Sequence, residues 1–543
     1  MAAGGRSTFR SALAGLRVAP ERDVRHSDVG ETVVTIKPPE KGTAWTAICD
    51  AAAAAHIAGM KPYGSLVKGS IDAMAVLADR LQVPGPPDAD TYYWPSNAHP
   101  PAIDGLRDYQ LAGIHRLVGN LERDGGAILA DDMGLGKTVQ TIGVWNALRR
   151  PVPLLVVAPA SVRRGWMKEF KRWTDVTPTL VETGAKAKKL TAADKVVITS
   201  YELVAKLGTE FCPHMLVMDE AHLLRGRMAG RSNALLETAR VCSYRLALTG
   251  TPMWSRPRDF WMLLKILFAY RFGTADEFDY AYCGASINQW GGKENKGATR
   301  LPELKRRLQY VMLRRLKEEV AKELPAMTRE IRWVKATKAA TQALQASALK
   351  QMSFPDALNA TLDAKIDVAV ETARAAGKFI LVTWQKRHAE LMHEQLNDNG
   401  NPCELITGDY SHKEREATVE RAIRNGTSLV VTIDSTNAGV NGMQYIANTV
   451  IFHALDYVPL KLAQMEARLH RIGQVNVVTA VYIAMEESAD SFVVDTVVEK
   501  LDQWKATMGN DSMAGLGATM DAPQSATHEA DALAAIYAAM GDE

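Results

Sequence analysis

A glycine-rich segment at residues 130–138, ADDMGLGKT, contains the residue types that bind phosphate groups. Gly134 and Gly136 allow a tight turn whose backbone N–H groups point inward, and Lys137 can reach the terminal phosphates of a nucleotide. The hydroxyl of Thr138 can ligate Mg²⁺. Taken alone, the segment also fits an ordinary strand-to-helix turn with a surface lysine, so other parts of the chain must decide.

An acidic pair follows an apolar run further along, in the segment MLVMDEAH. At the end of a buried strand, Asp219 can hold Mg²⁺ through water while Glu220 positions or deprotonates an attacking water. The alternative is an acidic cap on a strand end. A strand that delivers a phosphate loop earlier in the same α/β pattern favours the catalytic interpretation.

Two polar patterns on predicted helices add candidate groups. In QMEARLHRIGQ, Gln464, Arg468 and Arg471 are spaced i, i+4 and i+7, which predicts one helical stripe facing a cleft. In LRDYQLAGIHRL, Gln110 offers an amide donor and acceptor that can pair with an adenine edge. The alternatives are a solvated helix face and a solvated glutamine.

Alternating apolar strands and helices must position these groups. Apolar runs at LLVVAPAS, KVVITSYELV and RLALTGTP surround the acidic pair, and KFILVTW, LVVTIDSTNAGVNG and TVIFHALDY follow in the second half. This alternation predicts two parallel-sheet units. The helix after LLVVAPAS is rich in Arg and Lys, and its Trp166, Phe170 and Trp173 are expected to face the core. Ser411 and Glu414 predict a capping box on another helix.

Length and composition limit the number of domains and the classes of protein that fit this sequence. A length of 543 residues supports three or four domains, and 47% hydrophobic with 23% charged residues is ordinary for a globular protein. The net charge of +2 means that nucleic-acid binding needs a local basic surface. The five cysteines are scattered without a C-x-x-C pair, so we expect a reducing compartment and neither a zinc ribbon nor a disulfide framework.

The ends of the chain carry little chemical signal. Helices are predicted at 47–60 and 70–83, followed by a Pro-rich linker at 83–101. No apolar run approaches the ~18 residues of a membrane span. Residues 1–20 carry arginines without acids, for which a disordered start is preferred over a transit peptide. We expect a cytoplasmic, intracellular protein acting at DNA, with no membrane partner.

The order of these motifs resembles a known family. LRDYQ, DDMGLGKT, VVAPASVRRGW, ITSYE, DEAH and ALTGTP, in this order, are similar to the first motor lobe of superfamily-two helicases, specifically the Swi/Snf family of DNA translocases. MLRRLKEEVAKELP resembles that family's linker between lobes, with Arg314, Arg315 and Lys317 as linker residues. QMEARLHRIGQ resembles its arginine-finger motif, which implies that Arg468 and Arg471 reach nucleotide bound on lobe one.

The resemblance implies an α/β fold with two RecA-like parallel-sheet lobes of the P-loop NTPase type, helical insertions and a mainly helical N-terminal region. The chain is accordingly divided into an N-terminal region at 1–100, lobe one at 101–270, a helical insertion with the inter-lobe linker at 271–365, lobe two at 366–505 and a flexible tail at 506–543.

The resemblance also implies an ATP-dependent translocase on double-stranded DNA, with ATP and Mg²⁺ as cofactors. The expected catalytic residues are Lys137, Asp219, Glu220, Arg468 and Arg471. The expected nucleotide contacts are Gln110, Asp132, Met133, Gly134, Leu135, Gly136, Lys137, Thr138 and Gln464, with Thr138 and Asp219 as metal ligands. The expected DNA contacts are Ser161, Arg163, Thr199, Ser200, Thr407, Ser411, Thr436 and Gly442.

Contacts with phosphates rather than base edges predict little sequence preference. A strand-separating DNA or RNA helicase is the main alternative, and a DNA-binding scaffold with a degenerate ATP site is disfavoured by the intact motifs. The N-terminal region or the tail is a possible docking site for a protein partner.

Three departures from the family pattern stand out. Asp131 occupies the position six residues before the lysine where the generic phosphate loop has glycine. AGVNGMQ is compressed relative to the family's glycine-rich motif, which leaves the roles of Gly439, Asn441 and Gly442 open. No chromatin-reading, zinc or nuclease module is recognisable, so neither histone substrates nor DNA cleavage is expected.

Overall fold

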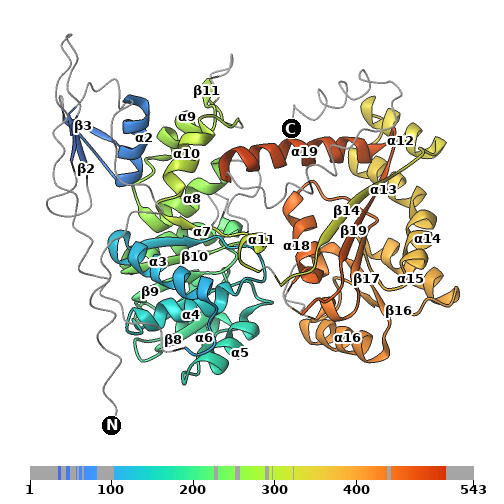
Figure 1. Ribbon diagram of the computed structural model, residues 1–543, viewed down its shortest axis with the longest axis horizontal. Helices are drawn as coiled ribbons and strands as arrows, with labels where there is room; N and C mark the ends of the chain where they lie inside the picture. The colour runs from blue at the N-terminus through green and yellow to red at the C-terminus, as the bar shows by residue number, and fades with distance from the viewer. Residues whose placement is uncertain are drawn as a thin grey trace.

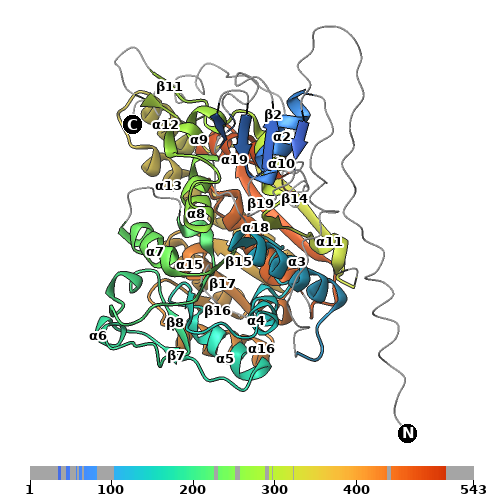
Figure 2. The ribbon, with the colours of Figure 1, turned by 90° about the vertical axis from the view of Figure 1, so that its left-hand side faces the viewer.

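The computed structural model describes residues 35–37, 45–48, 57, 60–63, 66–81, 103–224, 230–250, 257–287, 293–295, 297–321, 323–436, 442–471, 473–508 and 516. Two sheet-containing lobes lie side by side, with a small N-terminal unit against the first lobe (Figure 1). Turning the molecule places lobe one in front of lobe two (Figure 2). The predicted two-lobe α/β fold is therefore confirmed.

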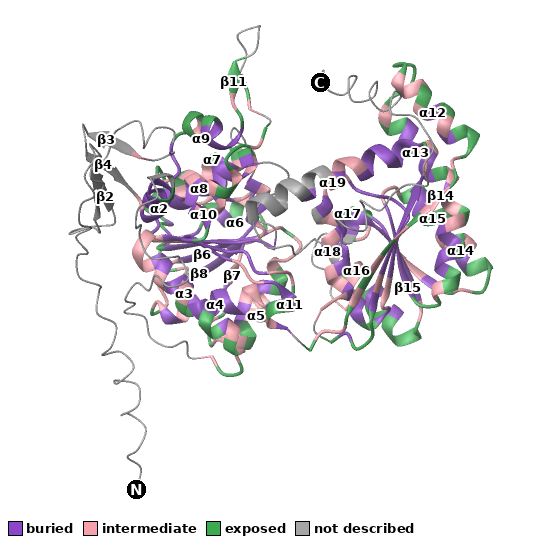
Figure 3. Ribbon diagram, turned by 45° about the horizontal axis from the view of Figure 1, so that its top comes forward, coloured by how far each residue is buried: buried purple, intermediate pink, exposed green. Residues whose placement is uncertain are grey.

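Lobe one contains a seven-stranded parallel sheet in the order β13-β5-β10-β9-β6-β8-β7. Its central strands are continuous apolar runs because helices cover both faces of a parallel sheet, and they are buried between those helices (Figure 3). The strands are β5 (Gly126–Leu129), β6 (Leu154–Val157), β7 (Thr179–Leu180), β8 (Val196–Thr199), β9 (Met215–Met218), β10 (Tyr244–Leu248) and β13 (Met312–Leu313). The helices are α3 (Asp108–Asp124), α4 (Lys137–Ala147), α5 (Arg163–Trp173), α6 (Gly184–Lys188), η1 (Val204–Lys206), η2 (Ala221–Leu224) and α7 (Gly230–Val241).

The basic helix α5 presents its aromatic residues to the core, as the sequence predicts. Trp166 and Phe170 are buried and pack against each other, with ring centroids 6.2 Å apart. The arginines and lysines occupy the other faces, and Arg164 and Lys168 are exposed.

A helical insertion follows lobe one and meets the N-terminal unit. It contains α8 (Pro257–Phe268), α9 (Ala275–Tyr282), β11 (Ser286–Ile287), β12 (Lys293–Glu294) and α10 (Leu301–Leu308). The N-terminal unit is an antiparallel sheet, β1-β2-β4-β3, with α2 packed on α10. Its elements are β1 (Thr35–Lys37), β2 (Trp45–Ile48), β3 (Lys61–Tyr63), β4 (Leu66–Gly69) and α2 (Ile71–Leu81).

The prediction of a mainly helical N-terminal region is wrong for the described residues. The helix predicted at 70–83 is confirmed as α2, but Ala47 and Ile48, in the helix predicted at 47–60, belong to strand β2. Residues 49–56 lie outside the described residues. Alanine has the highest helix propensity, but propensity is a weak determinant of structure, and the pairing of β2 with β4 overrides it at the start of the segment.

Buried charges attach α2 to the insertion. Asp72 accepts hydrogen bonds from Arg271 Nε at 2.7 Å and Arg307 Nε at 2.6 Å, and Asp72 and Arg307 have no exposed surface. Arg271 also pairs with Asp124 of α3 at 2.8 Å. Burial alone would raise the pKa of Asp72, but the two guanidinium groups outweigh it and hold this pKa well below its usual range. The N-terminal unit is thus joined to lobe one by an ion network.

A short segment connects the two sheets within the range 271–365, which was predicted to hold a helical insertion together with the inter-lobe linker. Strand β13 pairs with β5 in the lobe-one sheet, and β14 (Met327–Val334) pairs with β19 in the lobe-two sheet. Residues 314–326, which include the short helix α11 (Lys317–Val320), are left to connect the two sheets. Because open sheet edges can pair with further extended segments, β13 joins the edge of the lobe-one sheet and β14 joins the edge of the lobe-two sheet, which leaves a short connection between them.

Lobe two contains a six-stranded parallel sheet in the order β14-β19-β18-β15-β17-β16. Its other strands are β15 (Phe379–Thr383), β16 (Cys403–Ile406), β17 (Ser428–Thr432), β18 (Thr449–Phe452) and β19 (Val478–Met485). Its helices are α12 (Lys338–Ala348), α13 (Phe354–Ala364), α14 (Ile366–Ala376), α15 (Lys386–Asp398), α16 (His412–Asn425), α17 (Ile433–Thr436), η3 (Met443–Tyr445), α18 (Pro459–Leu469) and α19 (Ala489–Met508). The long helix α19 packs on α13 and extends back to α10 of the insertion (Figure 1).

Local signals in lobe two agree with the structure. Ser411 caps α16, since its backbone N–H donates to Glu414 Oε2 at 2.7 Å and Glu414 N–H donates to Ser411 Oγ at 3.4 Å. The helix ends at Gly426, which has φ 59°. The tail predicted at 506–543 lies outside the described residues except for the last turn of α19 and residue 516. Among the helices described, none is long and apolar enough to span a bilayer.

Candidate nucleotide site between the two lobes

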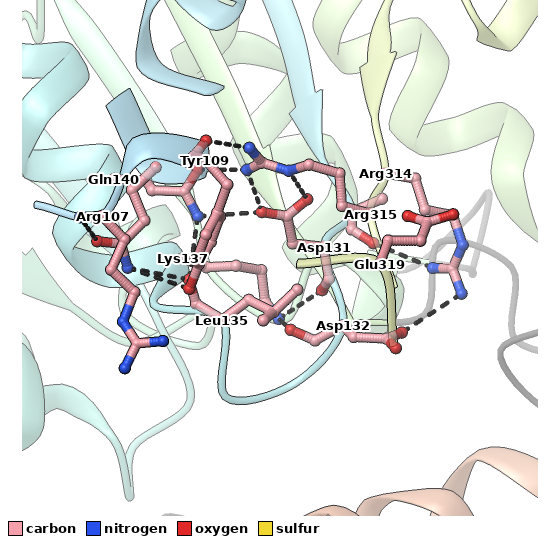
Figure 4. Close-up of polar contacts among 12 residues, drawn as sticks. Arg107, Tyr109, Asp131, Asp132, Leu135, Lys137, Gln140, Arg314, Arg315 and Glu319 are labelled. Carbon is pink, nitrogen blue, oxygen red and sulfur yellow. Dashed lines mark hydrogen bonds and ion pairs between the residues drawn. The ribbon is translucent and has the colours of Figure 1, made fainter. Parts of the chain in front are cut away.

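The phosphate loop has the predicted strand–turn–helix geometry. It leaves β5, turns through Gly134 at φ 87° and Gly136 at φ 77°, and enters α4, whose first two residues are Lys137 and Thr138. Positive φ is readily adopted by glycine and disfavoured for other residues. The Lys137 amine lies inside the turn and donates to the carbonyls of Asp131 at 2.8 Å and Asp132 at 3.2 Å (Figure 4).

Helix α3 holds this loop through Gln110. The Gln110 amide Nε2 donates to the Leu135 carbonyl at 3.2 Å, and its Oε1 accepts from the Arg107 N–H at 3.0 Å. The fit needs a glycine at 136, because a Cβ there would lie 2.5 Å from Gln110 Nε2. Gln110 thus lies at the nucleotide loop, with its amide groups bonded to protein, and its predicted contact with adenine stays a prediction.

The remaining loop residues point in different directions. Leu135 is buried, whereas Met133 lies toward Gly250, where a Cβ would be 2.9 Å from Met133 Cγ. The same position is 3.6 Å from Lys137 Nζ. Gly250, which follows β10, therefore packs directly against the phosphate loop, which the spacing of these motifs in the sequence does not reveal.

Asp131, the departure from the generic pattern, forms a buried ion pair with the linker. Arg315 Nη2 donates to Asp131 Oδ2 at 2.5 Å and Arg315 Nε to Oδ1 at 3.1 Å, and Gln140 Nε2 donates to Oδ2 at 3.0 Å (Figure 4). The guanidinium also donates to the Tyr109 carbonyl and lies over the Tyr109 ring at 5.1 Å. The Asp131 carboxylate thus connects the phosphate loop to the linker. A glycine at this position could not form these contacts.

The next linker residues continue these contacts. Arg314 Nη1 donates to the Ala130 carbonyl at 3.0 Å, and its Nη2 lies 3.6 Å from Asp132 Oδ1. The Lys317 backbone N–H donates to Asp132 Oδ2 at 3.2 Å. Sequence reasoning identified these three cations only as linker residues. The sequence did contain one signal for these contacts: the acidic pair of the phosphate loop is complementary in charge to the arginine pair of the linker.

The acidic pair lies at the end of β9, as predicted. Asp219 Oδ2 accepts from Trp166 Nε1 at 2.7 Å, and the Asp219 carbonyl accepts from the Tyr201 hydroxyl at 2.6 Å. Burial and the adjacent Glu220 raise the pKa of Asp219. A bound cation would oppose both effects, because it stabilises the ionised carboxylate. Asp219 is therefore suited to bind a cation.

Glu220 is held in an unusual conformation. Its φ of 50° lies in the left-handed region, which costs about 1–3 kcal/mol for a residue with a side chain. Its Oε2 lies 3.3 Å from His222 Nδ1, and the same imidazole nitrogen lies 3.3 Å from Thr249 Oγ1. Burial raises the pKa of Glu220, but His222 and the charges of Lys137 and Arg468 outweigh it and lower that pKa. The group is therefore an ionised carboxylate near neutral pH.

The finger segment of lobe two, residues 464–471, lies against this site. Gln464 and Arg468 belong to α18, and Gln464 is buried. Burial and the neighbouring Arg471 lower the pKa of Arg468 to about 10, while the negative charge of Glu220 opposes them. A Cβ at Gly134 would lie 3.6 Å from Arg471 Cβ. Both arginines thus lie at the lobe-one site.

The prediction of a single helical stripe is wrong for Arg471. Helix α18 ends at Leu469 and His470 is its C-cap, so Arg471 lies beyond the helix. The linker terminates the helix here, because the His470 ring donates to the Pro325 carbonyl at 2.8 Å and Lys317 Nζ donates to the His470 carbonyl at 2.7 Å. These tertiary contacts bring Arg471 to the loop without helical geometry.

The residues present fit a divalent ion carried with nucleotide phosphates. Thr138 at the start of α4 and Asp219, which follows β9, could supply oxygen ligands, which Mg²⁺ prefers. Among the described residues, no group of three or more His, Cys, Asp or Glu could hold a metal alone.

The lobe-one residues that were predicted to contact DNA are partly or fully buried. Thr199 is the last residue of β8 and Ser200 follows it; both are buried, and Ser161 is half-buried. The Arg163 guanidinium donates to the Val181 carbonyl at 2.6 Å and the Ala160 carbonyl at 3.2 Å. In this arrangement of the lobes, the Thr199 hydroxyl does not reach the surface, and its DNA contact stays a prediction.

The predicted contacts of lobe two differ in exposure. Thr407 is buried at the end of β16, whereas Ser411 is exposed and caps α16. Thr436 ends α17, and Gly442 has φ 102°. Gly439 and Asn441, whose roles the sequence left open, lie outside the described residues.

Comparison with known proteins agrees with the motif order. A model of the SNF2-related domain matches residues 109–383, and one of the helicase conserved C-terminal domain matches residues 361–473. The SWI/SNF-related matrix-associated actin-dependent regulator of chromatin subfamily A-like protein 1 of Xenopus tropicalis is 30% identical over 73% of this chain and 44% of the relative. The DNA annealing helicase and endonuclease ZRANB3 of Bos taurus is 28% identical over 69% of this chain and 38% of the relative.

One solved structure, the Sulfolobus solfataricus SWI2/SNF2 ATPase core in complex with dsDNA, is 21% identical with a TM-score of 0.39, covering 78% of this chain and 97% of that one. The chain spans less than half the length of the curated relatives named above. The SNF2-related domain model extends from α3 through β15, and the helicase model continues through the finger segment. This chain therefore belongs to the SNF2-related (Swi/Snf) family of superfamily-two ATPases.

Proposed function

We propose that this chain is an ATP-dependent translocase on double-stranded DNA, in which nucleotide bound at the lobe-one loop is hydrolysed when lobe two closes over it. The observation that carries the proposal is the position of the finger segment. Arg471 lies beside Gly134 of the phosphate loop, and Arg468 lowers the pKa of Glu220 on the opposite side. Groups from both lobes thus surround one place for a triphosphate.

Each residue of the site has a distinct role in this proposal. Lys137 exchanges the carbonyls of the loop for nucleotide phosphates, and the N–H groups at the start of α4 bind the same oxygens. Thr138 and Asp219 hold Mg²⁺, which neutralises phosphate charge. Glu220 orients the attacking water. Removing an arginine finger typically costs about 10³–10⁵ in rate, the contribution we assign to the pair Arg468 and Arg471.

The first experiment tests hydrolysis. Lys137→Ala and Glu220→Gln are expected to abolish DNA-stimulated ATPase activity with normal circular dichroism and melting. The exposed residues Lys338 and Glu394 offer matched controls, Lys338→Ala and Glu394→Gln, which should retain wild-type turnover. Undiminished turnover in both site variants would exclude the proposed catalytic site.

The finger role needs a separate readout. Arg471→Ala should lower kcat with little change in ATP affinity, because its contact is made mainly in the transition state. Arg374→Ala, on the exposed face of α14, is the control. A variant that loses mainly ATP affinity would instead assign Arg471 to ground-state binding.

DNA is proposed to lie across the face where α5 and α16 approach each other. Lys168 Nζ of α5 is 3.7 Å from Glu416 Oε1 of α16, so a single duplex could contact both helices. The contacts would be with phosphates, and affinity should therefore fall steeply with salt and vary little with sequence. ATPase stimulation by single-stranded, double-stranded and forked DNA identifies the preferred substrate.

Triplex displacement and duplex unwinding distinguish translocation from strand separation. Strong stimulation by duplex with displacement and no unwinding supports a translocase, and unwinding would favour the helicase alternative. We further propose that the protein acts inside the cell at DNA, with the N-terminal unit or the tail available to a protein partner.

A further inference from the structure

One linker residue, Lys317, touches both halves of the site. Its backbone N–H donates to Asp132 Oδ2 of the phosphate loop at 3.2 Å, and its side-chain Nζ donates to the His470 carbonyl of lobe two at 2.7 Å. The residue is 8% exposed and its side chain passes close to Gly134, where a Cβ would lie 3.8 Å from Lys317 Cε.

His470, the residue that Lys317 holds, lies between the two finger arginines. Its ring Nε2 donates to the Pro325 carbonyl at 2.8 Å. The linker therefore forms two hydrogen bonds with His470, one from Lys317 to its backbone carbonyl and one from its ring to Pro325. Because helix α18 ends at this residue, these contacts decide where the chain carrying Arg471 turns.

The charges around the Lys317 amine oppose one another. Burial disfavours its charged form, as do Lys137 of α4 and Arg471, whereas Asp132 of the loop and Glu466 of α18 favour it, and the balance lowers its pKa to about 8. The neighbouring His470 has a lowered pKa because of burial and the charges of Lys317 and Arg329, so its ring is neutral. Nucleotide phosphates would relieve the repulsion among these cations.

We propose that Lys317 is a positioning residue that holds the finger segment of lobe two over the phosphate loop through His470, so that the linker as well as the nucleotide controls lobe closure. The proposal rests on the function proposed above. It assigns no contact between Lys317 and the reacting atoms.

The test compares Lys317→Met, Lys317→Arg and the exposed control Lys335→Met in the full chain. Methionine keeps the length of the side chain and removes the donor, whereas arginine keeps a donor. Hydrogen exchange is measured without nucleotide on peptides covering residues 131–136 and 464–471, together with steady-state ATPase kinetics on duplex DNA. Melting temperature and circular dichroism exclude unfolded variants.

Lys317→Met should raise exchange of the finger peptide about tenfold, the factor expected from loss of one hydrogen bond to a charged donor. Its kcat should fall about tenfold or more through misplacement of the fingers, with KM changed little. Lys317→Arg should keep most of the protection, and Lys335→Met should match wild type in both assays.

Unchanged exchange of residues 464–471 in Lys317→Met would overturn the proposal, including when kcat falls, because the amine would then act elsewhere. Absence of ATPase activity in the wild-type chain would instead count against the proposed function. The exchange measurement needs no turnover, so the two failures are distinguishable.

Discussion

Replacing Arg315 by methionine removes the partner of a carboxylate that has no access to water. Asp131 is completely buried, and it accepts two hydrogen bonds from Arg315, at 2.5 and 3.1 Å, and one from Gln140 at 3.0 Å. The same guanidinium donates to Gln140 Oε1 at 2.7 Å. Arg315→Met therefore leaves a buried negative charge and an unsatisfied amide oxygen next to the phosphate loop.

The expected cost follows from this burial. Removing one partner of a buried ion pair costs about 3–5 kcal/mol. In the double variant Asp131→Asn/Arg315→Met the buried group is neutral, and the oxygen of the introduced amide can still accept a hydrogen bond from Gln140. We therefore expect the double variant to be destabilised by about 2 kcal/mol less than the sum of the two single variants, as for contacting residues in one network.

Hydrogen exchange of the β5 and phosphate-loop amides measures this effect without requiring two-state unfolding of a multidomain chain. A loss of about 3 kcal/mol should accelerate their exchange about 10²-fold. Arg258→Met, at an exposed position on α8, is the matched control. If Arg315→Met exchanges no faster than this control, or if the two single changes are simply additive, the pair does not secure the loop.

Three further predictions concern other parts of the site and the fold. Gly136→Ala should weaken nucleotide binding, measured with a fluorescent ATP analogue, because residue 136 has φ 77° and a Cβ there would lie 2.5 Å from the Gln110 amide. The control Gly165→Ala should bind nucleotide normally, because no atom lies within 4 Å of its new Cβ. Asp72→Asn should destabilise the docking of α2 by about 3–5 kcal/mol, because it removes the buried carboxylate that Arg271 and Arg307 share, and faster proteolysis within α2 would report it. The pKa of Lys317 is lowered to about 8 from its ordinary 10.5, so the nucleotide-free closed arrangement should become more favourable as pH rises between these values. ATP binding should return this pKa toward its ordinary value. Calorimetry of ATP binding near pH 9, in buffers of different ionisation enthalpy, should therefore find uptake of about one proton by the wild-type chain and none by Lys317→Arg.

The sequence predicts well what is encoded locally. The phosphate loop, the strand before the acidic pair and the capping box at Ser411 are set by glycine, apolar runs and short-range hydrogen bonds, all of which lie within a few residues of one another. For the same reason, the core face of α5 is predictable, since Trp166 and Phe170 are one helical turn apart.

The contacts that complete the site depend on the tertiary structure. Asp131 and Arg315 are 184 residues apart, and only the pairing of β13 with β5 brings the arginine beside the loop. The end of α18 is set by linker contacts to His470, so helical spacing alone misplaces Arg471. The N-terminal sheet forms from strands of three or four residues, too short for a reliable alternating pattern.

The linker between the edge strands β13 and β14 also determines the effective concentration of the finger segment at the phosphate loop. Residues 314–326 span at most about 45 Å even if fully extended, so lobe two cannot move far from lobe one. Short tethers of this kind give effective concentrations in the millimolar range. If Arg468 and Arg471 act as proposed above, the chain supplies its own arginine fingers in cis, and its ATPase rate per molecule should not depend on protein concentration.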